Sequence, residues 1–207
     1  MEASSINNYS GIIALTINAS TQPSQLEINL NNNAGSVYTN SFQLNTWIDI
    51  AGVFDGPNQL LYLYINGQLK STIPTSINEI ILNNQKNRFG NASIGSGQYG
   101  NYFDGNIDNI TIWNTALTQS EIQSFIYSSP TGNEAGLVGY WNCNEGSGST
   151  VNDLSGNGNN GTLFGGATWS TDAPSQYANN CTATDDIVVP VNPLPTIDLG
   201  ADTTLIC

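Results

Sequence analysis

Histidine is absent from the sequence, and only three of the 207 residues, Lys70, Lys86 and Arg88, are basic. Without histidine the chain has no Ser-His or Cys-His nucleophile pair, no histidine general base and no His-ligated zinc. The three basic residues stand against 16 acidic ones, which gives a net charge of -13. Because phosphate backbones and anionic lipid surfaces repel such a chain, we expect neither nucleic acid nor a membrane surface as a partner.

Long apolar runs are also missing. Hydrophobic residues make up 39% of the chain, but they occur in short runs, whereas a helix that crosses a bilayer needs about 20 in succession. We therefore expect no membrane insertion. Residues 1–10 show no basic stretch followed by an apolar one, so no secretory signal is visible. Either a signal lies upstream or the chain is a fragment.

The three cysteines, Cys143, Cys181 and Cys207, form no C-x-x-C pair. Neither a zinc ribbon nor a thioredoxin-like redox motif is therefore available. Cys143 and Cys181 can form a disulfide in an oxidising compartment, and the alternative is a buried free thiol at Cys143. Cys207 is the last residue and would lack a partner.

Short apolar segments separated by turn residues fill the first part of the chain, and this pattern predicts an all-β fold. Gly, Asn and Asp, which tolerate positive φ or bond their own backbone, mark the turns. Both faces of residues 47–54 are apolar, as in a central strand of a packed sandwich. The two faces are Ile48, Ile50 and Phe54, and Trp47, Ala51 and Val53. The predicted strands are residues 11–18, 25–30, 36–39, 47–54, 60–65, 92–95 and 107–113.

One helix is predicted, at residues 119–128. Thr118 and Glu121 have the spacing of a capping box, and apolar residues follow at helical intervals. Beyond this helix, residues 136–141 favour another strand, and residues 145–166 favour a loop rich in Gly, Asn and Ser.

Taken in order, several segments resemble the laminin-G-like, concanavalin-A-like jelly rolls found in large bacterial extracellular proteins. The resemblance is strong over residues 11–128 and implies an antiparallel jelly-roll β-sandwich with one short helix. The segments are WIDIAGVFDG (47–56), LYLYING (61–67), ASIG (92–95), YFDGNIDNITIWNTAL (102–117) and EI (121–122).

The family usually begins with further strands that this chain lacks, so residues 1–130 are interpreted as a laminin-G-like β-sandwich that is incomplete at its N-terminus. Residues 131–170 form a Gly/Asn-rich flanking segment that resembles the opening of such a module. This segment either packs back to replace a missing strand or is the remnant of a next repeat. Residues 171–195 are interpreted as a C-terminal linker or an immunoglobulin-like junction, similar to those of Bacteroidetes-type secreted proteins, and residues 196–207 as the start of a truncated following domain.

A calcium site is a hypothesis for the flanking segment. Oxygen-bearing side chains recur at every second residue between glycines, which is how a loop delivers several oxygens to Ca²⁺. The alternative is a flexible Gly/Asn loop. The family resemblance suggests that a structural ion joins the opening loop to the closing strand, with two aspartates as the second half of the site. The candidate ligands are Asp153, Ser155, Asn157, Asn159, Asp104 and Asp108.

Ligand contact is predicted at the Gly-rich loop that carries Tyr99, Tyr102 and Phe103, because loops at the rim of a sandwich carry function more often than its strands. Core packing is the expectation for Trp47, Trp113 and Trp141. No paired carboxylates of the kind that glycosidases use are visible along one strand, so the chain is predicted not to be an enzyme.

The sequence as a whole thus favours a non-catalytic binding or adhesion module of a secreted or cell-surface protein. The expected partners are carbohydrate or extracellular protein, together with other domains of the same long chain. The alternatives are a purely structural spacer repeat and the accessory domain of a carbohydrate-active enzyme.

Overall fold

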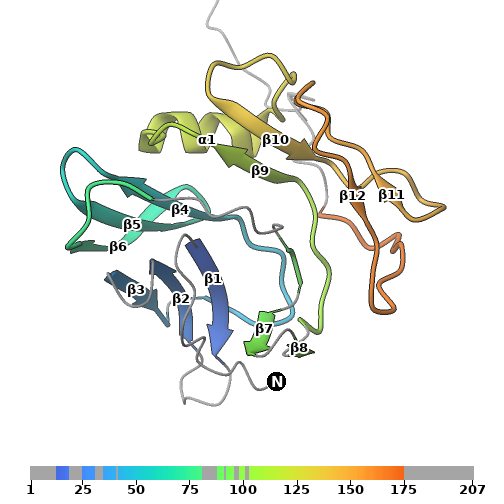
Figure 1. The fold of residues 1–207 in the computed structure, drawn as a ribbon, viewed down its shortest axis with the longest axis horizontal. Helices are drawn as coiled ribbons and strands as arrows, with labels where there is room; N and C mark the ends of the chain where they lie inside the picture. Colours follow the sequence, from blue (N-terminus) through green and yellow to red (C-terminus); the bar gives the residue numbers. More distant parts are fainter. Residues whose placement is uncertain are drawn as a thin grey trace, which may run out of the picture. The chain divides into compact units, whose positions relative to one another are not determined.

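The fold was obtained as a computed structural model, and Figure 1 shows its elements. The chain divides into one compact unit at residues 1–177 and a second at residues 178–207. The structure describes residues 13–18, 25–30, 35–40, 42–80, 88–90, 92–95, 98–100 and 103–174. The predicted following domain at 196–207 and most of the predicted linker at 171–195 therefore lie outside the described residues.

Antiparallel strands dominate the described residues, and the only helix among them is α1, so the all-β prediction is confirmed. The elements are β1 (Ile13–Asn18), β2 (Gln25–Leu30), β3 (Gly35–Thr39), β4 (Ile50–Asp55), β5 (Leu60–Ile65), β6 (Gln68–Pro74), β7 (Ala92–Gly95), β8 (Gln98–Gly100), β9 (Ile110–Trp113), α1 (Gln119–Tyr127), β10 (Leu137–Trp141), β11 (Thr150–Val151) and β12 (Gly161–Thr162). Three of these strands, β6, β11 and β12, and the short β8 were not predicted from the sequence.

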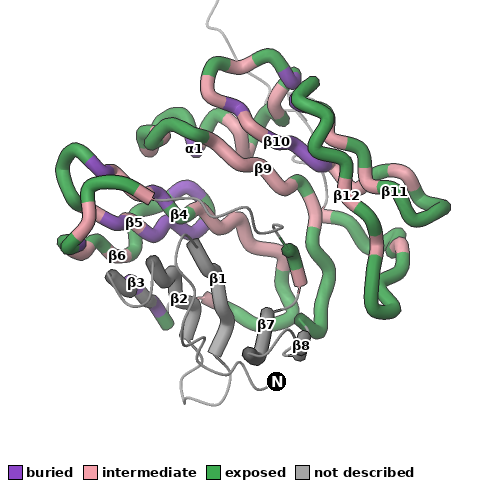
Figure 2. The backbone as a smooth tube through the Cα atoms, in the orientation of Figure 1, coloured by how far each residue is buried: buried purple, intermediate pink, exposed green. Residues whose placement is uncertain are grey.

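Two three-stranded sheets, in the orders β1-β2-β3 and β4-β5-β6, enclose the main core. Val37 of β3 packs in one buried cluster with Leu61, Leu63 and Ile65 of β5. Figure 2 shows how buried residues concentrate along β5. The prediction that residues 47–54 form a central strand is wrong in two respects: the strand begins at Ile50, and β5 is the middle strand of its sheet.

Five of the six residues of the two predicted faces are nevertheless separated as expected, whereas Trp47 belongs to neither cluster. Ile48, Ile50 and Phe54 pack against the cluster of Val37, whereas Ala51 and Val53 belong to a second cluster on the opposite side of the sheet. The second cluster also contains Tyr64 of β5 and Ile122 of α1. Because successive side chains of a strand point to opposite faces of the sheet, this one segment contributes to both clusters.

A tight hairpin joins β5 to β6 through Asn66 and Gly67, whose φ angles are 50° and 68°. Two positive φ values in succession are characteristic of the type I′ turn, whose twist matches that of the flanking strands. The Gly67 carbonyl oxygen accepts hydrogen bonds from the side-chain amides of Gln119 (3.1 Å) and Gln123 (2.9 Å), both on α1. This turn is thus the point at which the helix is attached to the sheet.

Helix α1 begins where the sequence predicted. Thr118 Oγ1 accepts from the Glu121 backbone N–H, and Glu121 Oε2 accepts from the Thr118 backbone N–H at 2.7 Å. These bonds lower the pKa of Glu121 below its ordinary value, chiefly through the Thr118 backbone N–H. The helix ends at Tyr127, one residue before the predicted boundary.

Strand β10 pairs antiparallel with β9, so the part of the chain beyond α1 packs back onto the preceding strands (Figure 1). The register shifts between Leu137 and Gly139, which leaves Val138 opposite no residue of β9. The structure thus places β10 beside β9, and the replacement of a missing strand by this segment stays a prediction. Within the described part of the chain no helix has the length and apolar character to cross a membrane.

Candidate functional site

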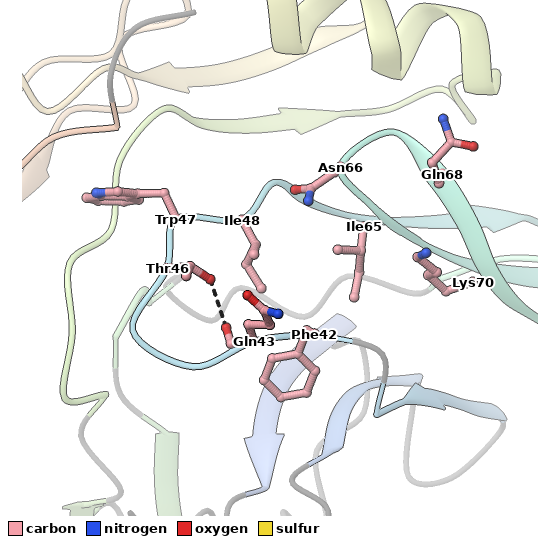
Figure 3. A pocket seen from close by; sticks show the side chains of 9 residues that line it. All are labelled: Phe42, Gln43, Thr46, Trp47, Ile48, Ile65, Asn66, Gln68 and Lys70. Carbon is pink, nitrogen blue, oxygen red and sulfur yellow. Dashed lines mark hydrogen bonds between the residues drawn. The ribbon is translucent and has the colours of Figure 1, made fainter.

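A groove lies between the segment before β4 and the β5–β6 hairpin (Figure 3). Its volume is about 440 Å³, which falls within the range of about 300–1,000 Å³ typical of ligand sites. The residues that line it are Phe42, Gln43, Thr46, Trp47, Ile48, Ile65, Asn66, Gln68 and Lys70.

The floor of the groove is continuous with the main core. Ile65 is only 3% exposed, and Phe42 and Ile48 are half-buried against the same cluster. Because these three side chains already pack on buried neighbours, the floor keeps its shape without a ligand. An apolar surface that is formed in advance costs less conformational entropy on binding than one that must assemble.

Two hydrogen bonds between Asp49 and Asn66 join the two walls of the groove. Asp49 N–H donates to Asn66 Oδ1 at 2.9 Å, and Asn66 N–H donates to the Asp49 carbonyl at 2.9 Å. In the wall before β4, Asn45 has a φ of 59°, and Thr46 Oγ1 donates to the Gln43 carbonyl at 3.0 Å. The chain therefore turns sharply here, which explains why Trp47 is not part of β4.

Trp47 lies at one end of the groove, and Gln68 and Lys70 lie at the other (Figure 3). Among the described residues that line it are two aromatic rings, three side-chain amides and one ammonium group, but no carboxylate. Aromatic rings and amides are the groups with which proteins hold an apolar face and hydroxyl groups of the same molecule. The groove could not be predicted from the sequence, because Trp47 stands in an apolar run that indicates a core strand and the residues of β6 give no strand signal.

Of the predicted ligand-contact residues, Phe103 is 36% exposed. Tyr99 lies on β8, where only the backbone is described, and Tyr102 lies outside the described residues. The Phe103 N–H donates to the Gly90 carbonyl at 2.7 Å, which places it near Phe89. Phe89 is 47% exposed, and its ring centroid lies 5.5 Å from that of the buried Trp141. We call Phe89, Phe103 and the exposed Ile107, whose Cδ1 lies beside Gly90, the rim patch.

The predicted calcium loop is held by hydrogen bonds of its own. Asp153 Oδ1 accepts from the backbone N–H groups of Tyr140 (3.0 Å) and Ser155 (2.9 Å), and Oδ2 accepts from that of Asn159 (2.8 Å). Desolvation alone would raise the pKa of Asp153, but these bonds outweigh it and lower the pKa to about 2. The carboxylate thus joins β10 to both ends of the loop.

The other three loop residues bind the backbone of β10. Ser155 Oγ, Asn157 Nδ2 and Asn159 Nδ2 donate to the carbonyl oxygen of Val138 at 3.1, 3.1 and 2.9 Å. Asn157 and Asn159 therefore turn their amide nitrogens toward the strand. Calcium requires six to eight oxygen ligands, and here three of the four side chains donate to one carbonyl oxygen of β10.

Asp104 and Asp108, the proposed second half of the ion site, lie on the segment before β9. Asp108 Oδ1 accepts from the Asn109 N–H at 2.9 Å, and burial raises the pKa of Asp108 despite this bond. No three Asp, Glu or Cys side chains among the described residues gather in a way that could hold a metal ion. Calcium binding at this loop stays a prediction.

Cys143 is a free, half-buried thiol in this structure, whereas Cys181 lies outside the described residues, so the disulfide stays a prediction. Burial, followed by the negative charges of Asp108 and Glu145, raises the pKa of the Cys143 thiol to about 11. One buried oxygen of Glu145, Oε2, has no hydrogen-bond partner. This environment keeps the thiol protonated and therefore unreactive at neutral pH.

Comparison with solved structures identifies a protein of Bacteroides ovatus, for which a carbohydrate-binding role has been suggested, with a TM-score of 0.61 and 22% sequence identity. The match covers 79% of this chain and 48% of that one, so the chain spans about half the length of this structure. An S-layer domain-containing protein of Clostridium thermocellum matches at 16% identity over 59% of this chain and 68% of that one, with a TM-score of 0.34. Among curated proteins none matches the chain.

Residues 3–123 match the sequence profile of the concanavalin A-like lectin/glucanases superfamily, in its laminin-G type. The matched range is more than half of the chain and includes both sheets that enclose the main core, as well as the groove. The fold of the Bacteroides ovatus protein agrees with this match. The chain belongs to the concanavalin A-like lectin/glucanases superfamily.

Proposed function

We propose that the chain is a non-catalytic carbohydrate-binding module that holds its ligand in the groove between Trp47 and Lys70. The observation that carries this proposal is the composition of the groove: an apolar floor with aromatic rings and side-chain amides around it. Sugars are suited to such a groove, because one face of a pyranose ring is apolar and its edge carries hydroxyl groups. The carbohydrate-binding role suggested for the Bacteroides ovatus protein supports the proposal.

A non-catalytic role is favoured by the chemistry of the groove. Glycosidases that retain configuration need two carboxyl groups about 5–5.5 Å apart, one on each side of the scissile bond. Among the described residues that line the groove there is no Asp or Glu. Histidine, the commonest general base, is absent from the whole chain. The described lining residues thus offer groups for binding a sugar, but no carboxyl pair for cleaving it.

As part of the same proposal, we place this module in a secreted or cell-surface protein, where it attaches the longer chain to glycans. The resemblance of the sequence to modules of large bacterial extracellular proteins supports this placement. Adhesion would then be the role of the whole protein, and sugar recognition the role of this module.

The test is a glycan-array screen of the chain, followed by calorimetric titration of the glycans that bind. We expect Trp47→Ala to weaken binding about five- to thirtyfold, because an aromatic group in a binding site typically contributes about 1–2 kcal/mol. Phe164→Ala is the matched control, since Phe164 is 73% exposed and does not line the groove. Circular dichroism should show that both variants are folded.

Two results would overturn the proposal. If no glycan binds, the chain acts as a structural spacer. If binding survives Trp47→Ala but is lost in Phe103→Ala, the ligand lies on the rim patch and the groove is not the site.

A further inference from the structure

Lys70 is an unusual residue in the groove because it places a positive charge in an acidic chain. It is one of only three basic residues against 16 acidic ones. Its side chain is exposed at the end of the groove opposite Trp47 (Figure 3). No carboxylate is among the described residues that line the groove with Lys70. Its charge is therefore available to a ligand.

The backbone at Lys70 departs from a regular ladder. Leu63 of β5 pairs with Ser71, and the next residue, Tyr64, pairs with Leu69. Lys70 therefore lies opposite no residue of β5, as the additional residue of a β-bulge. Bulges redirect side chains and are common beside binding sites. The hairpin departs from regular pairing at the residue that brings the cation to the groove.

We infer that the groove takes a sugar that carries a carboxylate, with the carboxylate paired to Lys70 and the apolar face of the ring on the side of Trp47. This inference rests on the proposed function and specifies its ligand class. Gln68 lines the same end of the groove, but its amide points away from the Lys70 side chain (Figure 3). Uronic acids and sialic acids are two sources of this chemistry.

The charge of the whole chain narrows the ligand class further. A net charge of -13 repels polyanions, and one lysine offsets this repulsion only locally. A short glycan with a single carboxylate can pair with Lys70 and meets little repulsion from the rest of the chain, whereas a densely sulfated polymer is repelled along its length. We therefore expect heparin-like chains to bind more weakly than a short glycan with one uronic acid residue.

The experiment compares oligosaccharides that differ only in the oxidation state of one sugar: a trisaccharide ending in galacturonic acid and its neutral galactose counterpart. A sialylated trisaccharide and a heparin fragment complete the set. Each is titrated calorimetrically into the full chain and into Lys70→Gln and Lys70→Arg. Lys70 is exposed, so unchanged thermal melts should accompany both substitutions.

We expect the acidic trisaccharide to bind the wild type about tenfold more tightly than the neutral one, which corresponds to one charged hydrogen bond. Lys70→Gln should abolish this preference, measured as the ratio of the two affinities, and Lys70→Arg should retain it. Added salt should weaken binding of the acidic sugar alone. The uronic and sialic arms identify which source of the carboxylate the groove accepts.

Equal affinity for the acidic and neutral trisaccharides would overturn the inference while leaving the carbohydrate proposal intact. The same conclusion would follow if Lys70→Gln weakened the binding of both sugars by the same factor. Binding of none of the sugars, together with an empty glycan array, would instead refute the proposed function itself. A preference for heparin over the short acidic glycan would refute the assignment to singly charged glycans.

Discussion

Replacing Asp153 should destabilise the protein strongly, even though the residue lies in a Gly/Asn-rich loop. Its carboxylate accepts three backbone hydrogen bonds, from Tyr140, Ser155 and Asn159. At about 1 kcal/mol for each bond, below the range of about 1.5–3 kcal/mol for a charged acceptor because the carboxylate is partly exposed, Asp153→Ala should lower the free energy of unfolding by about 3 kcal/mol. Asp153→Asn keeps one acceptor oxygen and should lose about 1–2 kcal/mol.

The pH dependence provides a second, independent measurement. The folded-state pKa of Asp153 is about 2, below its ordinary value of 3.8. A group whose pKa is lowered on folding stabilises the protein fully above its unfolded pKa, and this contribution is lost as the pH falls through the folded pKa. The difference in stability between wild type and Asp153→Asn should therefore be constant near neutral pH and shrink between about pH 4 and about pH 2.

Urea unfolding followed by tryptophan fluorescence measures both effects, because Trp141 donates its indole N–H to the carbonyl of Asn159 in the same loop (2.9 Å). All samples contain EDTA, so that a bound cation cannot contribute. Asp172→Ala is the control, since this exposed aspartate accepts from the Asn106 side chain at 2.9 Å and should change stability by less than about 0.5 kcal/mol. If Asp153→Ala and Asp172→Ala were equally stable, the loop would not be held by the carboxylate.

Three further predictions follow from single residues. Gly67→Ala should destabilise the protein by the backbone strain of a positive φ, about 1–3 kcal/mol, and in addition by a steric clash, because its Cβ would approach the Gln123 side chain at 2.7 Å. Gly156→Ala, at φ 77° with open space around it, should cost the strain alone. Equal urea midpoints for the two variants would contradict this prediction. Millimolar Ca²⁺ should raise the melting temperature by several degrees over EDTA if the sequence-based calcium hypothesis holds, whereas coincident melts would refute it. In a Cys181→Ser, Cys207→Ser background, Cys143 should react with a thiol reagent far more slowly in the folded protein than in urea, and equal rates would show that the thiol is not protected.

Local signals in the sequence predicted those elements that local interactions determine. The capping box of Thr118 and Glu121 placed the start of α1, since its two hydrogen bonds join residues three apart. The Asn66-Gly67 turn marked the end of β5. Strand β6 could not be predicted because its mostly exposed residues, QLKSTIP, show no clear alternation of apolar and polar side chains. Pairing with β5, and not local propensity, stabilises this strand.

Residues whose role depends on distant contacts could not be assigned in the same way. Trp47 belongs to an apolar run in the sequence, but the turn around Asn45 places it outside β4, where it lines the groove. Phe89 stands alone among polar residues and gave no signal, although it packs on Trp141. Asp153 and the alternating Ser and Asn residues after it have the same pattern whether their polar atoms face a cation or backbone amides, so the sequence could not decide between the two.

The bulge at Val138 has a consequence for how copies of this protein meet in solution. Its carbonyl oxygen, which a regular strand would offer to a neighbouring backbone N–H, is occupied by side-chain groups of Ser155, Asn157 and Asn159. The side chains of the loop thus supply the hydrogen bonds that a neighbouring strand would otherwise donate to this carbonyl. An incoming strand from another molecule would have to displace these donors before it could pair with β10, and this raises the barrier to edge-to-edge aggregation.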